Sequence, residues 1–512
     1  MIPFFGSFMF IICDTQRFWR RATSHDGQST STTITILGFS IYLFQDRETI
    51  RRLLRHPGVS SPMSRYTYAF ETMFGMPRKA QAFYQADDSG PFLKPYPGSL
   101  VSPPDRINRI THEKWLEAWH GAALTPTMYR FTRALSSRIE ALNITTEWTR
   151  MDDYFKSLGM VVGASTIEAI YGPLLLKVNP SFVEDLWAFD DMLPWLVRGL
   201  PSWIVPGTYK TRKRLHDQIK AWYAIARREF HESSIDSSGD GDPSWGSELV
   251  RGLHRVLLHR GSHDDDALAA HDLSQIWALS SNSISSAMLA VFHIAKDPQL
   301  VRRVREEIAE SFGSNPRWTH DVDMSRLSNL PLLSSIYAET LRLYMDAPVV
   351  VTAPVADADL GKWRLPRNGL ALVNPTLIHK DPSFWNTKDG LHPITSFWAD
   401  RFLIDPLDPT SGPTKPKVRN RGAETRNDKE SNKPVFSTQG LEGAWMPYGG
   451  GPSMCPGRLV AKNVIMFTCA LLAMEFDIVL VDDVLRLSSQ RFGLGMARAT
   501  SPIPVRLRKS QR

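Results

Sequence analysis

Hydrophobic residues occur along much of this chain at helical spacing. Several segments have the length and periodicity of buried or half-buried helices: residues 110–136, 272–295, 332–344 and 459–476. Two short β-branched and aromatic runs, residues 32–37 and 40–44, are separated by Gly38 and predict a hairpin. A further helix is expected just after that hairpin, at residues 47–54.

Three other stretches do not have a regular helical pattern. Residues 88–104 are rich in Gly, Pro and Ser and predict a long loop. Residues 405–439 are mostly polar and predict a flexible insertion between structured parts. Residues 186–205 are apolar and rich in Trp, and their prolines are expected to break them into pieces too short to span a membrane. Burial in the core and contact with lipid both remain possible for this third stretch.

Composition narrows the possible functions. The chain has 512 residues, 42% hydrophobic and 22% charged, as in ordinary globular proteins. Its net charge of +7 is spread along the chain without an aromatic-interleaved basic stripe, which argues against nucleic acid as a partner. The cysteines, Cys13, Cys455 and Cys469, have no CxxC spacing, so zinc sites and a disulfide framework are not expected. Residues 2–13 are apolar but too short to span a bilayer.

One glycine-rich stretch carries the chain's most specific chemistry. Gly449, Gly450 and Gly451 precede Cys455, which is followed by Pro456, Gly457 and an apolar helical segment. Glycines adopt positive φ easily and allow close approach to the backbone. A cysteine at a helix N-terminus is expected to have a lowered pKa, and its thiolate is a good ligand for a soft metal. The alternative is an inert core thiol.

The spacing of Tyr448, Gly451, Cys455 and Gly457 resembles the haem loop of the cytochrome P450 family, the haem-thiolate monooxygenases. Tyr448 stands where Phe is usual. The amino-acid sequence of the loop is similar to that of the sterol-hydroxylase and prostacyclin-synthase branch. The resemblance implies haem b (heme b, iron protoporphyrin) with Cys455 as its axial thiolate and metal ligand. It also implies a mainly α fold, a single large helical domain with small β-sheets near its N-terminal side.

The domain organisation follows from the same resemblance. We expect an apolar hinge or membrane-associated segment at residues 1–31 and a cytochrome P450 catalytic domain at residues 32–512, with the flexible insertion at 405–439. The chain begins near a proline-containing hinge that follows a membrane anchor in eukaryotic relatives. We therefore expect the protein at the endoplasmic reticulum membrane surface, on the cytosolic face, with the anchor either absent or missing from this sequence.

Glu339 and Arg342 are three residues apart and share one face of a predicted helix. An E-x-x-R pair alone is weak, because most such pairs are solvated surface charges. The resemblance implies that Arg401, in the segment Phe-Trp-Ala-Asp-Arg-Phe, joins them in a buried structural triad. Such a network can be satisfied internally, because arginine can donate two hydrogen bonds to one carboxylate. We expect it to brace the haem loop.

The helix at residues 272–295 carries small polar residues at its centre, ending in Asn282 and Ser283. The resemblance makes this the helix that crosses the distal face of the haem and makes Asn282 and Ser283 the catalytic positions. The usual residues there are an acid and a Thr. Ser283 can donate a hydrogen bond, whereas Asn282 cannot titrate. The source of the protons therefore stays open.

The haem carboxylates need polar partners. Trp115 and Trp119 lie one helical turn apart, and the resemblance implies that their helix lies beside a haem propionate. Simple packing in the core explains the two tryptophans equally well. Ser453 and Thr352 stand where the family usually has basic residues, and their hydroxyl groups are left as hydrogen-bond donors to the propionates.

The resemblance implies a monooxygenase that uses O2 and electrons to oxidise or hydroxylate a lipophilic small molecule. A terpenoid, steroid or polyketide-like substrate in fungal secondary metabolism is expected. The chain has no flavin or nicotinamide fingerprint, so a separate NADPH–cytochrome P450 reductase is the expected electron donor. Two alternatives remain: a reductase-independent isomerase or dehydratase acting on a peroxide, and a non-catalytic haem-binding paralogue.

Overall fold

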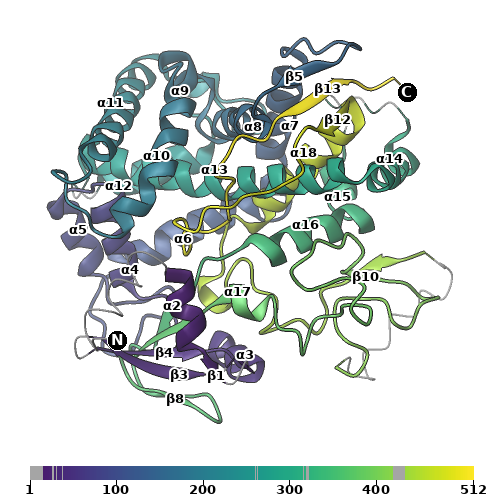
Figure 1. Ribbon diagram of the computed structural model, residues 1–512. Helices are drawn as coiled ribbons and strands as arrows, with labels where there is room; N and C mark the ends of the chain where they lie inside the picture. The colour runs from purple at the N-terminus through teal and green to yellow at the C-terminus, as the bar shows by residue number, and fades with distance from the viewer. Residues whose placement is uncertain are drawn as a thin grey trace.

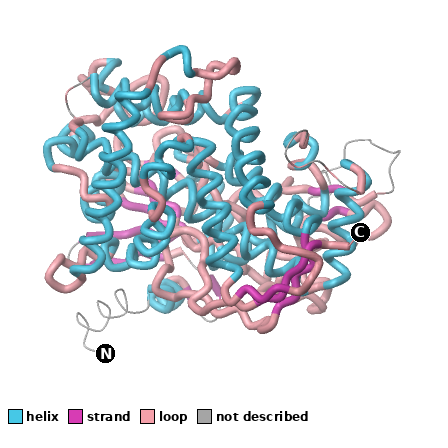
Figure 2. The backbone as a smooth tube through the Cα atoms, turned by 90° about the horizontal axis from the view of Figure 1, so that it is seen from above, coloured by secondary structure: helices cyan, strands magenta, loops and turns pink. Residues whose placement is uncertain are grey.

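The computed structural model describes residues 15–25, 28–29, 31–36, 39–259, 261, 263–314, 316, 318, 322–418 and 433–511. The described protein is mainly helical, as the resemblance implied. Figure 1 shows α13 (Asp265–Lys296) running across the middle, with α10 (Phe182–Val197) and α11 (Pro206–Glu229) above it and α16 (Pro331–Tyr344) below it. Seen from above in Figure 2, helices form most of the body and strands are confined to small patches.

The remaining α-helices are mostly short to medium in length. They are α2 (Thr15–Ala22), α3 (Arg47–Arg55), α4 (Met63–Tyr68), α5 (Arg78–Gln85), α6 (Ile107–Trp119), α7 (Leu124–Glu140), α8 (Tyr154–Tyr171), α9 (Pro173–Val178), α12 (Glu248–His259), α14 (Pro298–Phe312), α15 (Met324–Leu327), α17 (Pro375–Ile378) and α18 (Arg458–Glu475). Short 3-10 or π turns are η1 (Ala69–Met73), η2 (Pro103–Asp105), η3 (Gly121–Ala123), η4 (Glu232–Ser234) and η5 (Gly451–Ser453).

The strands form small sheets at two ends of the molecule. One four-stranded sheet has the order β3 (Thr32–Ile36), β4 (Phe39–Phe44), β9 (Leu370–Val373), β6 (Val349–Thr352), with β4 and β9 parallel and the other pairs antiparallel. A three-stranded antiparallel sheet has the order β12 (Phe476–Leu480), β13 (Val505–Lys509), β5 (Thr149–Met151). Two-stranded pieces are β1 (Ser24–His25) with β2 (Gln28–Ser29), β7 (Ala358–Asp359) with β8 (Arg364–Leu365), and β10 (Leu403–Ile404) with β11 (Val435–Phe436).

The core is built around α13. Cys469 of α18 packs against it, with its sulfur 4.0 Å from the carbonyl oxygen of Ala287. On another side, the hydroxyl of Tyr154 in α8 donates to the carbonyl of Met288 over 2.6 Å. Within the described residues, α13 is the helix that is long and apolar enough to cross a membrane, but most of it is buried inside the protein. It is therefore the central core helix of the domain.

Two predictions from the sequence are wrong in detail. Residues 110–136 do not form one helix: α6 ends at Trp119, and Gly121, with φ +58°, turns the chain before α7 begins. Pro194 does not break the preceding apolar stretch, because it lies inside α10, and the chain leaves the helix only after Val197. The predicted hairpin, and the helices beginning near residues 47, 332 and 459, are present.

Parts of some predictions lie outside the described residues. These parts are the N-terminal apolar residues 2–13, the hairpin connection at Gly38, and residues 419–432 of the predicted insertion. The described flanks of that insertion are folded back onto the protein. For example, Asn386 donates its side-chain amide to the carbonyl oxygens of Thr410 and Gly412.

Candidate active site around Cys455

The loop that carries Cys455 is shaped by a close backbone approach. Gly451 has φ +63°, and a Cβ at this position would lie 2.3 Å from the carbonyl oxygen of Leu54 at the end of α3. Only glycine combines this φ with this contact. Further along, the backbone N–H of Cys455 donates to the carbonyl of Tyr448 over 3.0 Å and closes the loop. The glycine run therefore fixes the path of the chain into Cys455.

The Cys455 residue is exposed, in contrast to Cys469, which is buried in the core. The lowered pKa expected from a helix N-terminus is wrong. Burial of the sulfur among protein atoms raises the pKa of Cys455, and the backbone N–H of Gly457 and the charge of Arg458 offset this only in part. α18 begins at Arg458, beyond Pro456 and Gly457, so Cys455 precedes the helix instead of lying in its first turn. Metal coordination would deprotonate such a thiol outright.

Tyr448, which replaces the expected Phe, has a specific partner. The hydroxyl of Tyr337 in α16 donates to the hydroxyl of Tyr448 over 2.9 Å. Burial raises the pKa of Tyr448 well above its usual value, and the pKa of Tyr337 is raised for the same reason. The two phenols therefore stay neutral and satisfy each other, which explains how a polar ring is accommodated beside the loop.

Glu339, Arg342 and Arg401 meet in a fully buried ion network. Arg342 donates Nε to Oε2 of Glu339 over 2.7 Å and Nη2 to Oε1 over 2.9 Å. Arg401 donates Nε to both carboxylate oxygens, at 3.0 and 3.1 Å. All three side chains are 0% exposed. One carboxylate thus accepts from two guanidinium groups, the geometry that makes a buried charge tolerable.

His379 connects this triad to the Cys455 loop, and the sequence analysis did not identify it. Arg342 donates Nη1 to the backbone carbonyl of His379 over 2.7 Å. The backbone N–H of Met446 donates to Nε2 of the same histidine over 3.0 Å. Nε2 must therefore be unprotonated, which agrees with a pKa that burial lowers to about 3. A single His after a short helix has no periodicity or spacing that would reveal this role.

The central turns of α13 have one face that is not buried. Ala278 is exposed, and Leu279 and Asn282 are half-buried, in a helix whose other residues nearby are mostly buried. Asn282 accepts a hydrogen bond at Oδ1 from the backbone N–H of Met496 over 2.9 Å. This contact fixes the amide orientation, so Nδ2 remains as the donor end. Ser283 donates its hydroxyl to the carbonyl of Leu279 over 2.6 Å, so its proton is used within the helix.

The structure brings Trp119 close to Cys455. Trp115 and Trp119 are buried and meet edge to face, with ring centroids 4.4 Å apart. A Cβ on Gly457 would lie 3.3 Å from the Trp119 ring and 3.8 Å from the sulfur of Cys455. Trp119 therefore packs against the turn that follows the cysteine, and this packing is compatible with either role considered for the two tryptophans.

The other residues considered as partners of the haem carboxylates lie in separate elements of the structure. Ser453 lies in η5, and its side chain is outside the described part of the structure. Thr352, in β6, pairs its backbone N–H and carbonyl with Ser60. Arg458 donates to Nε2 of His120 over 2.9 Å and to the carbonyl of Cys455 over 3.2 Å. This arginine therefore braces the cysteine turn against the residue that follows α6.

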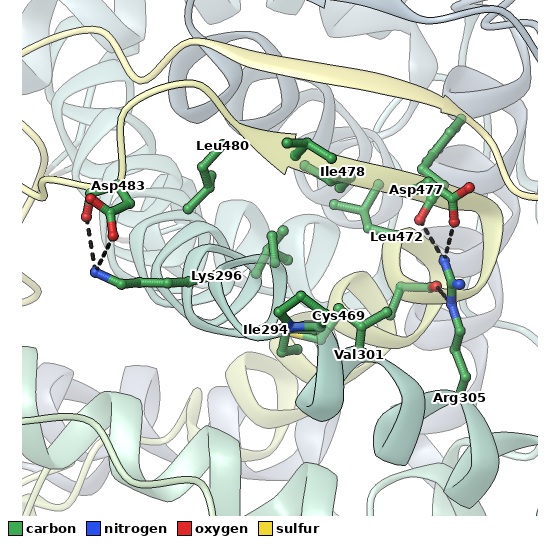
Figure 3. Close-up of a pocket in the computed structure, with 16 residues that line it drawn as sticks. Ile294, Lys296, Val301, Arg305, Cys469, Leu472, Asp477, Ile478, Leu480 and Asp483 are labelled. Atoms are coloured by element: carbon green, nitrogen blue, oxygen red, sulfur yellow. Dashed lines mark hydrogen bonds and ion pairs between the residues drawn. The ribbon is translucent and has the colours of Figure 1, made fainter.

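A separate cavity lies at the far end of α13. It has a volume of about 440 Å³ and lies between the C-terminal end of α13, α18 and β12. Figure 3 shows Lys296 reaching Asp483 and Arg305 reaching Asp477 at its rim, with Ile294 and Cys469 at its apolar wall. Both ion pairs are 2.9 Å long. Its lining residues include Cys469 but none from the Cys455 loop, so this cavity is distinct from the site described above.

Comparison with protein-family models matches residues 175–403 to the family described as Cytochrome P450. The matched range contains α13, Glu339, Arg342 and Arg401. It ends before the Cys455 loop, whose resemblance to the family's haem loop rests on the sequence motif alone.

Comparison with curated proteins extends the similarity to the whole chain. Cytochrome P450 monooxygenase efuG of Hormonema carpetanum is 28% identical over 100% of this chain and 89% of that protein. Cytochrome P450 monooxygenase fsoE of Humicola fuscoatra is 29% identical over 99% of this chain and 86% of that protein. Cytochrome P450 7B1 of Mus musculus is 24% identical over 92% of this chain and 88% of that protein.

Proposed function

Because this chain belongs to the cytochrome P450 family and is a monooxygenase of that family, we propose that it hydroxylates or otherwise oxidises a lipophilic small molecule in fungal secondary metabolism. The observation that carries the proposal is Cys455, an exposed residue at the end of a braced glycine loop. A terpenoid, steroid or polyketide-like substrate fits a site bordered by apolar and small polar residues.

The residues around Cys455 fit a haem group. The thiol is the type of soft ligand that haem iron accepts, and its loop is fixed by Gly451. The indole ring of Trp119 packs beside the turn after Cys455, and Trp115 packs against Trp119. The unburied face of α13, at Ala278, Leu279 and Asn282, carries no charged side chain and would allow an apolar flat ring to lie against it. When bound, haem b supplies the activation of O2, with the thiolate donating electron density to the iron.

The chain's own residues do three things for this chemistry. The triad and His379 hold the Cys455 loop in place. The Nδ2 group of Asn282 offers a fixed hydrogen-bond donor on the unburied face of α13. The Ser283 hydroxyl donates its proton to the carbonyl of Leu279 within the helix, and its oxygen can still accept a hydrogen bond. Because neither side chain titrates near neutral pH, we propose that protons arrive through water or through the substrate.

The family implies a redox partner and O2, and we propose NADPH–cytochrome P450 reductase as the electron donor. We further propose that the protein acts at the endoplasmic reticulum membrane surface, on the cytosolic face. Trp203 is 80% exposed and Ile204 is 47% exposed in the connection between α10 and α11. Exposed Trp beside an aliphatic residue favours contact with a lipid interface.

A second candidate function is reductase-independent rearrangement or dehydration of a peroxide. It is favoured by Asn282, which replaces the usual acid and whose amide is held by Met496. Turnover of a lipid hydroperoxide without NADPH and reductase would support this function. A non-catalytic haem-binding role predicts neither kind of turnover.

The reduced, carbon-monoxide difference spectrum of the wild type beside Cys455→Ala tests the main proposal. We expect a red-shifted thiolate-type band in the wild type and its loss in the variant. NADPH-dependent, reductase-dependent oxidation of a lipophilic probe would then establish monooxygenation. Purified, folded protein that takes up no haem would overturn the proposal, and haem uptake with an imidazole-type band in the wild type would contradict the role of Cys455.

A further inference from the structure

Pro194 leaves one backbone acceptor free inside α10. A proline has no N–H, so the carbonyl of Asp190, four residues earlier, has no helical partner. Arg491 fills this position by donating Nη1 to the Asp190 carbonyl over 2.7 Å. A residue near the C-terminal end of the chain thereby completes the hydrogen bonding of α10.

The side chain of Asp190 collects further donors from two other elements. Its Oδ1 accepts from Nε1 of Trp277 over 2.6 Å, from Oγ of Ser281 over 3.0 Å and from Nη2 of Arg491 over 3.1 Å. Its Oδ2 accepts from Nη1 of Arg498. We call these five residues the Asp190 cluster. One carboxylate thus joins α10, α13 and the segment 491–498.

The Asp190 cluster is buried and incompletely satisfied. Asp190 is 5% exposed, Arg491 3% and Arg498 4%. Nε of Arg491 and Nη2 of Arg498 are buried without a hydrogen-bond partner in the described structure. The half-exposed Asp191 adds a second carboxylate, 3.2 Å from Arg498, and the Arg498 guanidinium stacks 3.6 Å above the Trp187 ring. Buried charges with unpaired donors are weak evidence for stability and better evidence for a specified position.

The segment between the two arginines lies against Asn282. Met496 donates its backbone N–H to Oδ1 of Asn282 over 2.9 Å. A Cβ on Gly495 would lie only 2.0 Å from the same oxygen, so the backbone packs directly on the amide. On its other edge, the segment pairs with the chain after α16, where Asp346 donates its N–H to the carbonyl of Gly495 over 2.9 Å. Because Asp190 holds Arg491 and Arg498, it also holds the backbone between them, against which the Asn282 amide packs.

We propose that Asp190 is a positioning residue for the distal site. It holds the segment 491–498 against α13 and thereby sets the orientation of the Asn282 amide on the unburied face of that helix. The role in catalysis rests on the proposed function, whereas the hold on the segment is a property of the protein itself. The cluster therefore shapes the surroundings of Asn282, the side of α13 on which the proposed function places haem and substrate.

The first test is hydrogen–deuterium exchange of the holoenzyme, read by mass spectrometry over the segment 491–498. Asp190→Asn keeps an acceptor at Oδ1 but removes the charge that both arginines need. We expect about tenfold faster exchange in this segment, because the Met496 N–H loses its fixed partner. The matched control is Asp185→Asn on the same helix. Asp185 is also buried and paired with an arginine, but its partners Arg214 and Gln218 lie on α11.

The second test uses ligand binding to the ferric haem. Imidazole binds by coordinating the iron alone. The phenyl group of 4-phenylimidazole must also fit against the protein on the side of Asn282. Asp190→Asn is expected to weaken 4-phenylimidazole about tenfold and imidazole by less than about twofold, because positioning errors act on the larger ligand. The thiolate-type band with carbon monoxide should be retained, since the cluster does not touch the Cys455 loop.

Each outcome separates the two proposals. Unchanged exchange in the segment 491–498, or an equal rise in Asp185→Asn, would overturn the positioning role whether or not haem binds. Faster exchange together with equal weakening of both azoles would also contradict it, because the distal pocket would then not be shaped by the cluster. Should Asp190→Asn fail to fold, Ser281→Ala removes the hydroxyl that donates to Asp190 without unpairing a charge, and the same two readouts apply. Failure of the wild type to give a thiolate band would instead count against the proposed function.

Discussion

His379 and Met446 are joined by a hydrogen bond of 3.0 Å from the Met446 backbone N–H to Nε2 of the histidine. The backbone carbonyl of the same histidine accepts from Arg342 of the buried triad. The loop before Cys455 is therefore tied to the Glu339 network through one neutral imidazole. The position of the Cys455 loop therefore depends on a residue whose hydrogen bonds are to Met446 and Arg342.

His379→Ala should release the Cys455 loop. The change leaves the Met446 N–H buried without a partner, which costs about 1–3 kcal/mol, and opens a cavity beside the triad. We expect the reduced, carbon-monoxide spectrum to shift from the thiolate-type toward the imidazole-type band, with faster loss of haem on mild heating. His392→Ala is the matched control, since the half-buried His392 stacks on Trp398 and makes no hydrogen bond to Met446. Equal spectra for the two variants would show that His379 does not support the loop.

Gly451 and Gly449 separate two effects of the glycine run. Both have positive φ, +63° and +71°, but only at Gly451 would a Cβ strike backbone, the Leu54 carbonyl. A Cβ on Gly449 meets only a Val349 methyl group, at 4.0 Å. We expect Gly449→Ala to cost about 1 kcal/mol through backbone strain, and Gly451→Ala roughly 3 kcal/mol with loss of haem. Thermal unfolding and haem content of the two purified variants would measure this, and equal losses would refute the role of the Leu54 contact.

The buried carboxyl of Asp346 makes the free energy of unfolding depend on pH, and its raised pKa sets the direction of that dependence. Burial raises the pKa of this carboxyl to about 7, and the N–H of Gly493 and the charges of Arg491 and Lys380 offset burial only in part. Between about pH 4 and 7 the folded state holds a proton that the unfolded state has lost, so stability falls as pH rises through this window. The slope approaches roughly 1.4 kcal/mol per pH unit.

The variant Asp346→Asn should remove the contribution of this carboxyl to the pH dependence of stability. Denaturant unfolding at several pH values between 5 and 8 should show the wild type losing stability relative to the variant as pH rises. Buried His379 acts in the opposite direction, because its pKa is lowered to about 3. Below about pH 6.5 the unfolded state binds a proton that the folded state does not, so stability falls on acidification. The difference between wild type and variant isolates Asp346, and a difference that does not change with pH would contradict the raised pKa.

Much of the fold was accessible from the sequence because it depends on local patterns. The apolar runs at α13, α16 and α18 have helical periodicity, and the hairpin of β3 and β4 has β-branched residues on each side of a turn. The Cys455 loop and the three charged residues of the triad were found by motif and resemblance. The exact start of α18 was not, since Pro456 and Gly457 form a turn of their own before Arg458.

The parts that could not be predicted depend on contacts between distant segments. Pro194 was expected to break α10, but the acceptor that it frees is taken by Arg491, far along the chain. The raised pKa of Cys455 results from burial by surrounding elements, whereas the sequence showed only the nearby helix and Arg458. His379 and Asp190 stand alone in the sequence, without a spaced partner, so their roles appear only when the elements are packed together.

The start of α3 braces the beginning of the Cys455 loop, and this has a consequence for biosynthesis. Arg47 donates to the carbonyl oxygens of Glu442 and Gly440, and the first of these bonds joins residues 395 positions apart in the chain. A ribosome makes the residues around Glu442 only after the 395 positions that follow Arg47 have been made. The loop therefore reaches its final shape late, and until then Arg47 of α3 lacks the carbonyl oxygens to which it donates. We therefore expect a prosthetic group bound at Cys455 to be inserted only after the contact between Arg47 and this part of the chain has formed.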